Sequence, residues 1–338
     1  MEKSAILIVG GYGHVGSQIA TWLQAAVVAP VRIAGRDKSK LAEASARLCC
    51  QSAHLDLGMP ETWPQALVGV GCVIVCVDQT DTGFAAEVLK RGLVYLDITA
   101  DDGFFRQIEA LDGLARDKGG RAVLSVGLAP GLTNLLVKAA AAHMDTVESA
   151  RIGILLGLGD THGPAAVDWT LCNFRKVRPS SAEDVPYGDP PRRFPAVPFD
   201  FADQYVLRRT LGIANVRTLM TFDTPLLSRI MFTVLHRVAA SASLTRLFKA
   251  LLPHARLGSD RAALSVEVQG TKAGRKLTKT IRMEGRKEAQ ITALIAALVV
   301  EHVLRSDISP GVHHIEQILS IDALASRIPR DAGVVFDM

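Results

Sequence analysis

The feature that most constrains the fold is a glycine-rich turn close to the N-terminus. The apolar run 5–9 leads into Gly11-Tyr12-Gly13-His14-Val15-Gly16, a G-x-G-x-x-G pattern that opens an amphipathic stretch. A strand, this turn and a helix, in that order, are the context that a dinucleotide-binding motif requires. Gly11 would permit the tight turn, Gly13 would let the backbone approach a pyrophosphate, and Gly16 would let the helix lie against the strand. The amides at the N-terminus of the helix would face the phosphates, and His14 and Val15 of the turn would also bind the cofactor. The alternative is a glycine turn without a ligand.

The first third of the chain alternates apolar runs with amphipathic stretches. The apolar runs have the length of strands and cover residues 5–9, 31–34, 72–77, 94–96 and 122–126. The amphipathic stretches between them have the length of helices and cover residues 16–26, 38–48, 82–90 and 104–118. Strands that are apolar throughout and separated by helices predict a parallel sheet covered on both faces. We therefore expect an α/β chain with an N-terminal doubly wound Rossmann domain, whose ligands lie at the carboxyl ends of the strands.

The regular alternation of apolar runs and amphipathic stretches ends after about Leu132. A helical stretch and a strand-like run (134–143 and 150–158) are followed by an irregular segment, residues 175–201, which is rich in proline. Two alternating strands, 263–269 and 276–284, are joined by a connection of hairpin length. This pattern predicts a second, α+β domain built on an antiparallel sheet, in agreement with the two domains that 338 residues suggest.

Composition and charge exclude several classes of protein. Hydrophobic residues make up 49% and charged residues 21% of the chain, as in globular proteins. The formal charge is only +4, basic residues occur in pairs such as Arg192-Arg193, and aromatic residues are 5%, so we expect no nucleic-acid partner. The apolar run 293–300 is too short to span a membrane, and the N-terminus lacks a signal-peptide pattern. We therefore expect a cytoplasmic protein. No cysteine or histidine spacing indicates a metal site.

Residues 226–252 carry an apolar face interspersed with basic residues: Arg229, Arg237, Arg246 and Lys249. Such a segment can lie on a membrane surface, but the pattern is more often a core or dimer-interface helix. We therefore expect a homodimer that acts on a small-molecule substrate and has no membrane partner.

The tip of the second predicted strand bears on the choice of cofactor. A site for NAD usually places an acidic residue there, about 20 residues after the glycine motif, to hold the ribose hydroxyls. Here Arg36 stands twenty residues after Gly16, and Lys40 follows nearby. An arginine can pair with the 2′-phosphate of NADP, whereas an acid would repel it. Asp37 lies one position later and could still serve as the acid, so we predict NADP, with NAD as the alternative.

The doubly wound layout places other residues beside the cofactor. Asp56 follows the third predicted strand and would lie beside the adenine. At the tip of the fourth strand, Val77, Asp78 and Gln79 would border the nicotinamide, and Thr99 follows the fifth strand. These placements follow from the rule that ligands bind at the carboxyl ends of parallel strands.

Three residues are candidates for acid–base chemistry. Asp97 stands at the carboxyl end of the fifth strand, and its alternative role is a helix cap or a loop hydrogen bond. Asp160 and His162 lie in a glycine-rich connection, where they could relay a proton because histidine titrates near neutrality. The alternative for this connection is a turn that caps a helix.

Four segments together resemble the saccharopine dehydrogenase family: the glycine motif, the strand tip Ala34-Gly35-Arg36, the strand end Leu96-Asp97-Ile98-Thr99 and the stretch 126–134, VGLAPGLTN. The resemblance is strongest over residues 1–135. It returns in Val167-Asp168-Trp169-Thr170 and near the turn Pro310-Gly311. It implies a Rossmann domain interrupted by a substrate domain. Residues 1–132 and 286–338 would form the dinucleotide-binding domain, and residues 133–285 the substrate and dimerisation domain.

The resemblance also implies which residues meet the substrate. Pro130, Gly131 and Asn134 would line the substrate side of the nicotinamide, and Trp169 and Thr170 would come from the second domain. This chain departs from the family at Ala129, where members that bind amino acids often carry an acid.

The function that the resemblance implies is an NADP-dependent oxidoreductase that acts on a C–N bond, amine or imine, of a small amine or amino-acid-derived substrate. Two alternatives stay open: a reductase of C=C or C=O bonds on the same fold, since a fold does not determine function, and a non-catalytic NADP-binding sensor or scaffold.

Overall fold

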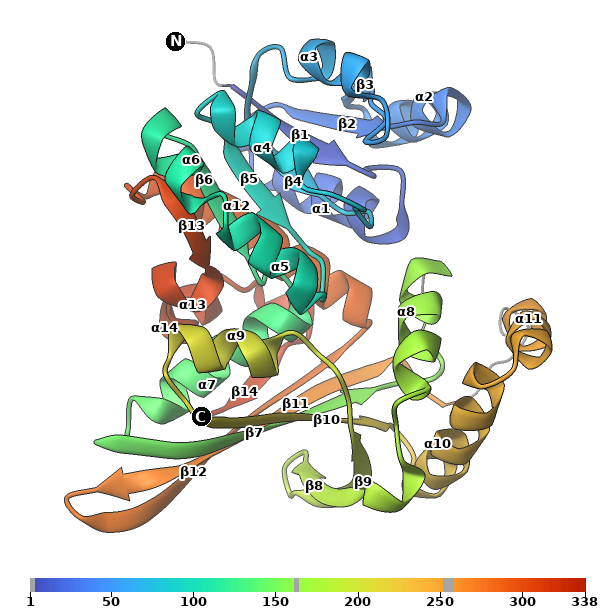
Figure 1. The fold of residues 1–338 in the computed structure, drawn as a ribbon, viewed down its shortest axis with the longest axis vertical. Coiled ribbons are helices and arrows are strands. Elements are labelled where there is room, and N and C mark those ends of the chain that lie inside the picture. Colours follow the sequence, from blue (N-terminus) through green and yellow to red (C-terminus); the bar gives the residue numbers. More distant parts are fainter. Residues whose placement is uncertain (1–3, 161–163, 252–257) are drawn as a thin grey trace. The chain divides into compact units, whose positions relative to one another are not determined.

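The computed structural model describes residues 4–160, 164–251 and 258–338 and is shown in Figure 1. The chain forms two compact units. The first contains residues 1–132 and 292–327, and the second contains residues 133–291 and 328–338. Each unit is built around one seven-stranded sheet.

The first sheet is parallel throughout, with the strand order β13-β6-β5-β4-β1-β2-β3. Its strands are β1 (Ala5–Val9), β2 (Val31–Gly35), β3 (Gln51–His54), β4 (Val70–Val75), β5 (Val94–Asp97), β6 (Arg121–Leu124) and β13 (Gly311–His314). Its helices are α1 (His14–Ala25), α2 (Lys38–Leu48), α3 (Trp63–Ala66), α4 (Gly83–Lys90), α5 (Asp102–Glu109), α6 (Asp112–Lys118), α13 (Ile315–Ile318) and α14 (Ile321–Ala325), and α12 (Glu288–Arg305) leads the chain back to this unit.

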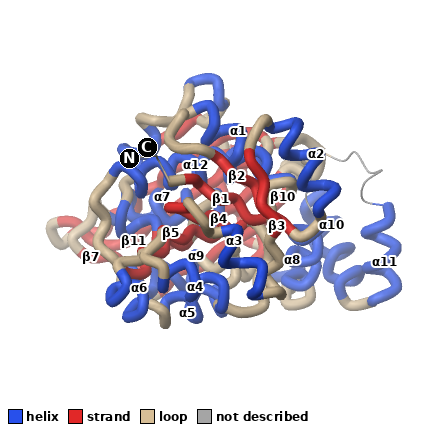
Figure 2. The backbone as a smooth tube through the Cα atoms, turned by 90° about the horizontal axis from the view of Figure 1, so that it is seen from above, coloured by secondary structure: helices blue, strands red, loops and turns tan. Residues whose placement is uncertain are grey.

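The strand order reverses direction between β1 and β4, which defines a doubly wound sheet. Because parallel crossovers are right-handed, α1 and α2 cover one face and α4, α5 and α6 cover the other, as Figure 2 shows. The central strands β1 and β4 are buried almost throughout, as their apolar sequences predict. The expected Rossmann-type domain is therefore confirmed, and its switch point lies at the carboxyl ends of β1 and β4.

Two local details of this unit differ from the sequence prediction. The helical stretch 104–118 is divided into α5 and α6, and α5 begins earlier because the Asp101 carboxylate accepts the amide of Phe104 at its N-terminus, 2.7 Å away. The turn expected at Pro310-Gly311 leads directly into β13, which pairs with β6. A strand of four residues is too short to show a hydrophobic period.

The second sheet has the order β14-β12-β11-β7-β10-β9-β8. Its strands are β7 (Thr146–Leu156), β8 (Glu183–Tyr187), β9 (Arg192–Pro198), β10 (Asn215–Phe222), β11 (Arg261–Lys272), β12 (Arg275–Arg286) and β14 (Val335–Asp337). The sequence predicts an antiparallel sheet, and this is correct except that β7 and β10 run parallel, so the sheet is mixed. Their long connection, which includes two α-helices and the β8–β9 hairpin, returns the chain to the same end of the sheet.

Two further expectations for this unit are corrected. The proline-rich segment 175–201 is not an irregular loop, because it contains the β8–β9 hairpin. Prolines are tolerated there because β8 is an edge strand and β9 pairs with β10 at only two positions. The assignment of 286–338 to the first domain is wrong for its last stretch, because β14 pairs with β12.

The helices of the second unit are α7 (Thr133–Ala141), α8 (Pro164–Phe174), α9 (Asp203–Thr210), α10 (Pro225–Ala239) and α11 (Ala242–Leu251). Of these, α7 packs on β11 and α9 packs on β10. Helix α10 buries Met231, Phe232 and Leu235. Over the described part of the chain, no helix has both the length and the apolar character needed to cross a bilayer.

Candidate cofactor and active site

The glycine turn between β1 and α1 is held by close packing at three of its glycines. A Cβ on Gly11 would lie 2.6 Å from Ile33 Cβ, and one on Gly16 would lie 2.5 Å from the carbonyl oxygen of Gly10. Gly10 itself has a φ of +80°, which favours glycine. The motif as we interpreted it omitted Gly10, although the pair Gly10-Gly11 is visible in the sequence. These three glycines fix the turn against its own helix and the neighbouring strand.

Gly13 is different, because little of the protein occupies the space beside it. The nearest atom to a Cβ at Gly13 would be the carbonyl oxygen of Gly10, 3.0 Å away. Gly13 is the N-cap of α1, and no side chain caps this helix. The first amides of α1, beginning at His14 and Val15, are therefore available donors at the positive end of the helix dipole. The arrangement fits a phosphate group, which such a helix end binds.

Two charged residues at the tip of β2, Arg36 and Asp37, differ in their contacts. The exposed Arg36 has no hydrogen bond or ion pair with any described residue. The carboxylate of Asp37 caps α2 by accepting the amides of Ser39 and Lys40, each at 3.1 Å. The hydrogen bond from the Lys40 amide holds the pKa of Asp37 below its usual value. The Lys40 ammonium lies 3.7 Å from the same carboxylate.

Asp56 supports the loop that follows β3. Its Oδ1 accepts the amide of Gly58 at 3.0 Å, and its carbonyl oxygen accepts the indole N–H of Trp63 at 3.0 Å. The contact with adenine stays a prediction for this residue.

The end of β4 meets both the glycine turn and the end of β5. Val77 lies against the turn, since a Cβ on Gly10 would be 2.5 Å from Val77 Cγ1, and Asp78 is exposed. Gln79 Nε2 donates to the Tyr95 hydroxyl at 2.7 Å and to Asp97 Oδ2 at 2.6 Å. Gln79 Oε1 is buried and has no hydrogen-bond partner among the described residues. An N–H group of a bound molecule would satisfy it.

Asp97 is the buried carboxyl group at the centre of this cluster, with only 1% of its surface exposed. The Tyr95 hydroxyl donates to Oδ2 at 2.7 Å, and the Thr99 amide donates to Oδ1 at 2.6 Å. Burial raises the pKa of Asp97 to about 7, although both hydrogen bonds oppose the shift. A carboxyl group that is partly protonated at neutral pH suits general acid–base work.

Sequence reasoning missed Tyr95, the phenol that contacts this carboxyl group. The signal was present, because Tyr95 precedes Asp97 by two residues and alternate residues of a strand share one face. Burial and the neighbouring Asp97 raise the pKa of Tyr95 well above its ordinary value, so the phenol keeps its proton and donates it.

The ends of β6 and β13 form a second buried polar cluster in the same unit. The Ser125 hydroxyl lies 2.8 Å from His314 Nδ1, and His314 Nε2 lies 2.9 Å from Glu109 Oε1. Ser125 has a φ of +59°. The Pro130-Gly131 turn is buried and folds back on this strand end, because a Cβ on Gly131 would lie 2.8 Å from the Ser125 carbonyl oxygen.

In the second unit, the residues expected near the substrate occupy two helices. Asn134 is fully buried in the first turn of α7. Trp169 and Thr170 are half-buried on α8. The Trp169 ring packs against Phe199 and Phe201, with ring centroids 5.5 and 5.0 Å apart. Its indole N–H has no hydrogen-bond partner in the described part of the chain.

The two remaining candidates for acid–base chemistry do not form a described pair. The Asp160 carboxylate accepts the amide of Glu288 at 2.8 Å and so caps the N-terminus of α12. Helix capping was the alternative role predicted for this connection. Asp160 does cap a helix, but that helix, α12, is distant in sequence. His162 lies outside the described residues. Within the described ranges, no group of three or more His, Cys, Asp or Glu side chains could hold a metal ion.

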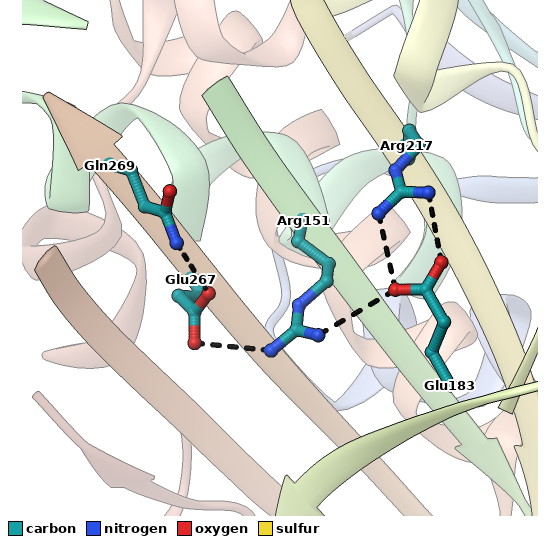
Figure 3. A network of polar contacts seen from close by, with 5 residues as sticks. All are labelled: Arg151, Glu183, Arg217, Glu267 and Gln269. Atoms are coloured by element: carbon teal, nitrogen blue, oxygen red, sulfur yellow. Dashed lines mark hydrogen bonds and ion pairs between the residues drawn. The ribbon is translucent and has the colours of Figure 1, made fainter. Parts of the chain in front are cut away.

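The second sheet carries a row of alternating charges, shown in Figure 3. Arg151 on β7 lies between Glu267 (3.2 Å) and Glu183 (3.8 Å), and Glu183 also binds Arg217 (2.8 Å). Three members of this row, Arg151, Arg217 and Glu267, line a polar pocket of about 410 Å³.

Comparison with solved structures identifies the fold. Apo saccharopine dehydrogenase (L-Glu forming) from Saccharomyces cerevisiae matches with a TM-score of 0.67 at 11% identity, and the match covers 99% of each chain. The chain has a saccharopine dehydrogenase-like fold. DAP dehydrogenase from C. glutamicum, in complex with DAP, matches with a TM-score of 0.54 at 15% identity, covering 98% of each chain. An engineered D-amino acid dehydrogenase bound to NADP+ matches with a TM-score of 0.52 at 15% identity, covering 97% of this chain and 98% of that one. No family model and no curated protein sequence matches the chain.

Proposed function

We propose that the protein is an NADP-dependent oxidoreductase that acts on the C–N bond of a small amine or amino-acid-derived substrate. The observation that carries this proposal is the buried Asp97 carboxyl group, linked to Tyr95 and Gln79 at the strand ends next to the glycine turn. The fold supports it, because the similar structures include dehydrogenases named for saccharopine, DAP and D-amino acids.

The residues at the glycine turn and at the β2 tip fit this cofactor. The space beside Gly13 and the uncapped amides of α1 would hold the pyrophosphate. Arg36 would pair with the 2′-phosphate, while Asp37 is engaged in capping α2 and is therefore less suited to bind ribose hydroxyls. When bound, NADP supplies or accepts a hydride, and the protein contributes position and electrostatics.

The remaining site residues would bind the substrate and exchange a proton with it. Asp97 holds a proton near neutral pH and would exchange it at the substrate nitrogen. Gln79 Oε1 would accept an N–H group of the bound molecules. We assign the substrate side to Pro130, Gly131, Asn134, Trp169 and Thr170.

The test is consumption of NADPH with single compounds and with pairs of an amine and an aldehyde or keto acid. The proposal expects turnover only when both an amine and a carbonyl compound are present, or with a preformed imine. Turnover with a carbonyl compound or an enone alone would favour the C=O or C=C reductase. Binding of NADPH without any turnover would favour the sensor.

Arg36→Ala should weaken NADPH binding by about 1.5–3 kcal/mol, the range of a hydrogen bond to a charged group, and leave NADH binding nearly unchanged. The reason is that only NADPH carries the 2′-phosphate. Isothermal titration with both cofactors measures the difference, and Arg106→Ala, an exposed arginine on α5, is the matched control. Equal losses for the two cofactors would remove Arg36 from the phosphate site.

Trp169→Phe should lower kcat/KM while the melting temperature stays nearly constant. Phenylalanine can keep the ring contacts with Phe199 and Phe201, but it lacks the indole N–H and the wider apolar face. Thermal unfolding and steady-state kinetics measure the two quantities separately. A lower melting temperature with unchanged kinetics would assign Trp169 to packing alone.

We also propose that the protein is a homodimer, joined through the face of the second sheet that carries the charged row. A two-fold axis reverses the order of the row, so Glu267, Arg151, Glu183 and Arg217 of one copy would meet residues of opposite charge in the other. Sedimentation velocity measures the mass in solution, and a monomer at all concentrations would contradict this assembly.

A further inference from the structure

Helix α10 has two apolar faces, although a helix on the surface of a domain needs only one. Its inner face buries Met231, Phe232 and Leu235, and Phe232 lies 6.0 Å from the ring of Phe222 on β10. The helix is therefore already anchored to its own unit. Its second apolar face is left partly exposed to solvent.

This second face is a stripe of exposed aliphatic side chains. Leu226, Ile230 and Val234 follow one another at intervals of four residues, so they lie on one side of α10. Their exposed fractions are 71%, 52% and 38%. On α11, which contacts α10, Leu244 and Leu247 are also exposed. Five of the twelve large apolar side chains exposed among the described residues belong to these two helices.

The charged residues that α10 and α11 themselves carry are all basic. Between Asp223 and Asp260 the sequence contains five basic residues and no acidic one. Arg229 and Arg237 lie beside the stripe on α10, and neither forms an ion pair with a described residue. Lys249 on α11 is paired with Asp168 of α8. The surface formed by α10 and α11 is thus both apolar and basic.

We propose that α10 and α11 dock on a bilayer that contains anionic phospholipids. Aliphatic side chains next to arginines are the pattern of a helix that lies in the membrane interface, where the arginines meet lipid phosphates. A second copy of the chain fits less well, because a two-fold contact would bring arginines of both copies together. A two-fold contact through the charged row on the second sheet would instead bring opposite charges together, because the charges of the row alternate in sign. Binding to a membrane surface is the alternative that the sequence of residues 226–252 leaves open beside a core or dimer-interface helix.

Co-sedimentation of the full chain with vesicles tests the proposal. One set of vesicles contains phosphatidylcholine alone, and the other contains equal amounts of phosphatidylcholine and phosphatidylglycerol. The protein should bind the anionic vesicles, bind neutral ones far more weakly, and be released by high salt. Two double variants, Leu226→Ser with Ile230→Ser and Arg229→Glu with Arg237→Glu, should each reduce binding roughly tenfold or more.

The matched controls carry the same chemical changes elsewhere. Met59→Ser with Val68→Ser removes two exposed apolar side chains of the first unit, and Arg192→Glu with Arg193→Glu reverses two exposed charges of β9. Both controls should keep vesicle binding. Failure of the unaltered protein to bind anionic vesicles, or equal losses in controls and patch variants, would overturn the proposal. So would a smaller sedimenting mass of the Leu226→Ser/Ile230→Ser variant without vesicles, because the stripe would then join two copies.

Discussion

Gly13→Val should weaken the binding of NADPH and NADH by at least about a hundredfold, or about 2.7 kcal/mol, while the protein remains folded. The added side chain would occupy the space that we assign to the pyrophosphate. A Cβ at Gly13 would meet only one atom of the protein within 4 Å, the Gly10 carbonyl oxygen at 3.0 Å, so the turn needs only a small shift of that atom to admit a side chain. Isothermal titration with each cofactor and thermal unfolding measure the two effects.

Valine variants of two other glycines serve as comparisons for this experiment. Gly113→Val on α6 is the matched control, since nothing lies within 4 Å of a Cβ at that position, and cofactor binding should be unchanged. Gly16→Val should instead destabilise the fold, because its Cβ would lie 2.5 Å from the Gly10 carbonyl oxygen. Retained affinity for both cofactors in Gly13→Val would show that the glycine turn serves another purpose.

Asp97→Asn should remove a pH dependence of stability from the protein. Burial raises the pKa of Asp97 from its ordinary 3.8 to about 7, so between these values the native state binds a proton that the unfolded chain releases. The free energy of unfolding of the unaltered protein should therefore fall as the pH rises from 4 to 7, by at most about 4 kcal/mol. Chemical denaturation at several pH values measures this slope, and asparagine, which does not titrate, should flatten it.

A second carboxyl variant controls for surface charge. Asp78→Asn removes an exposed carboxylate at the end of the preceding strand and should keep most of the slope. Once a substrate is known, Asp97→Asn should also lower kcat by about a hundredfold or more, the contribution expected of a general acid. An unchanged slope in Asp97→Asn would show that the buried carboxyl group ionises as in water.

The first unit could be predicted in detail because its signals are local. Strands buried on both faces are apolar throughout, and the glycine motif marks one strand, one turn and one helix at once. The sequence therefore indicates β1, α1 and the parallel sheet. It does not indicate β13, whose four residues pair with β6 from the far end of the chain.

The site is predicted less completely, because its contacts join residues distant in sequence. Asp97 is recognisable as a carboxylate at a strand end. Its pKa depends on burial, on Tyr95 and on Gln79, which comes from another strand end. Asp160 is the opposite case: its neighbours in sequence predict acid–base chemistry, but its carboxylate accepts a hydrogen bond from the amide of Glu288. The exposed stripe on α10 likewise depends on which of its two apolar faces the sheet covers.

We propose that hydride transfer occurs at a carbon bonded to nitrogen. NADPH that carries deuterium at its reactive carbon tests this step most directly. The protein is incubated with the amine and carbonyl pairs, and the products are analysed by mass spectrometry. We expect deuterium on the carbon of a newly formed C–N bond. Deuterium on an alcohol carbon, or on a carbon of a former C=C bond, would contradict the proposed chemistry.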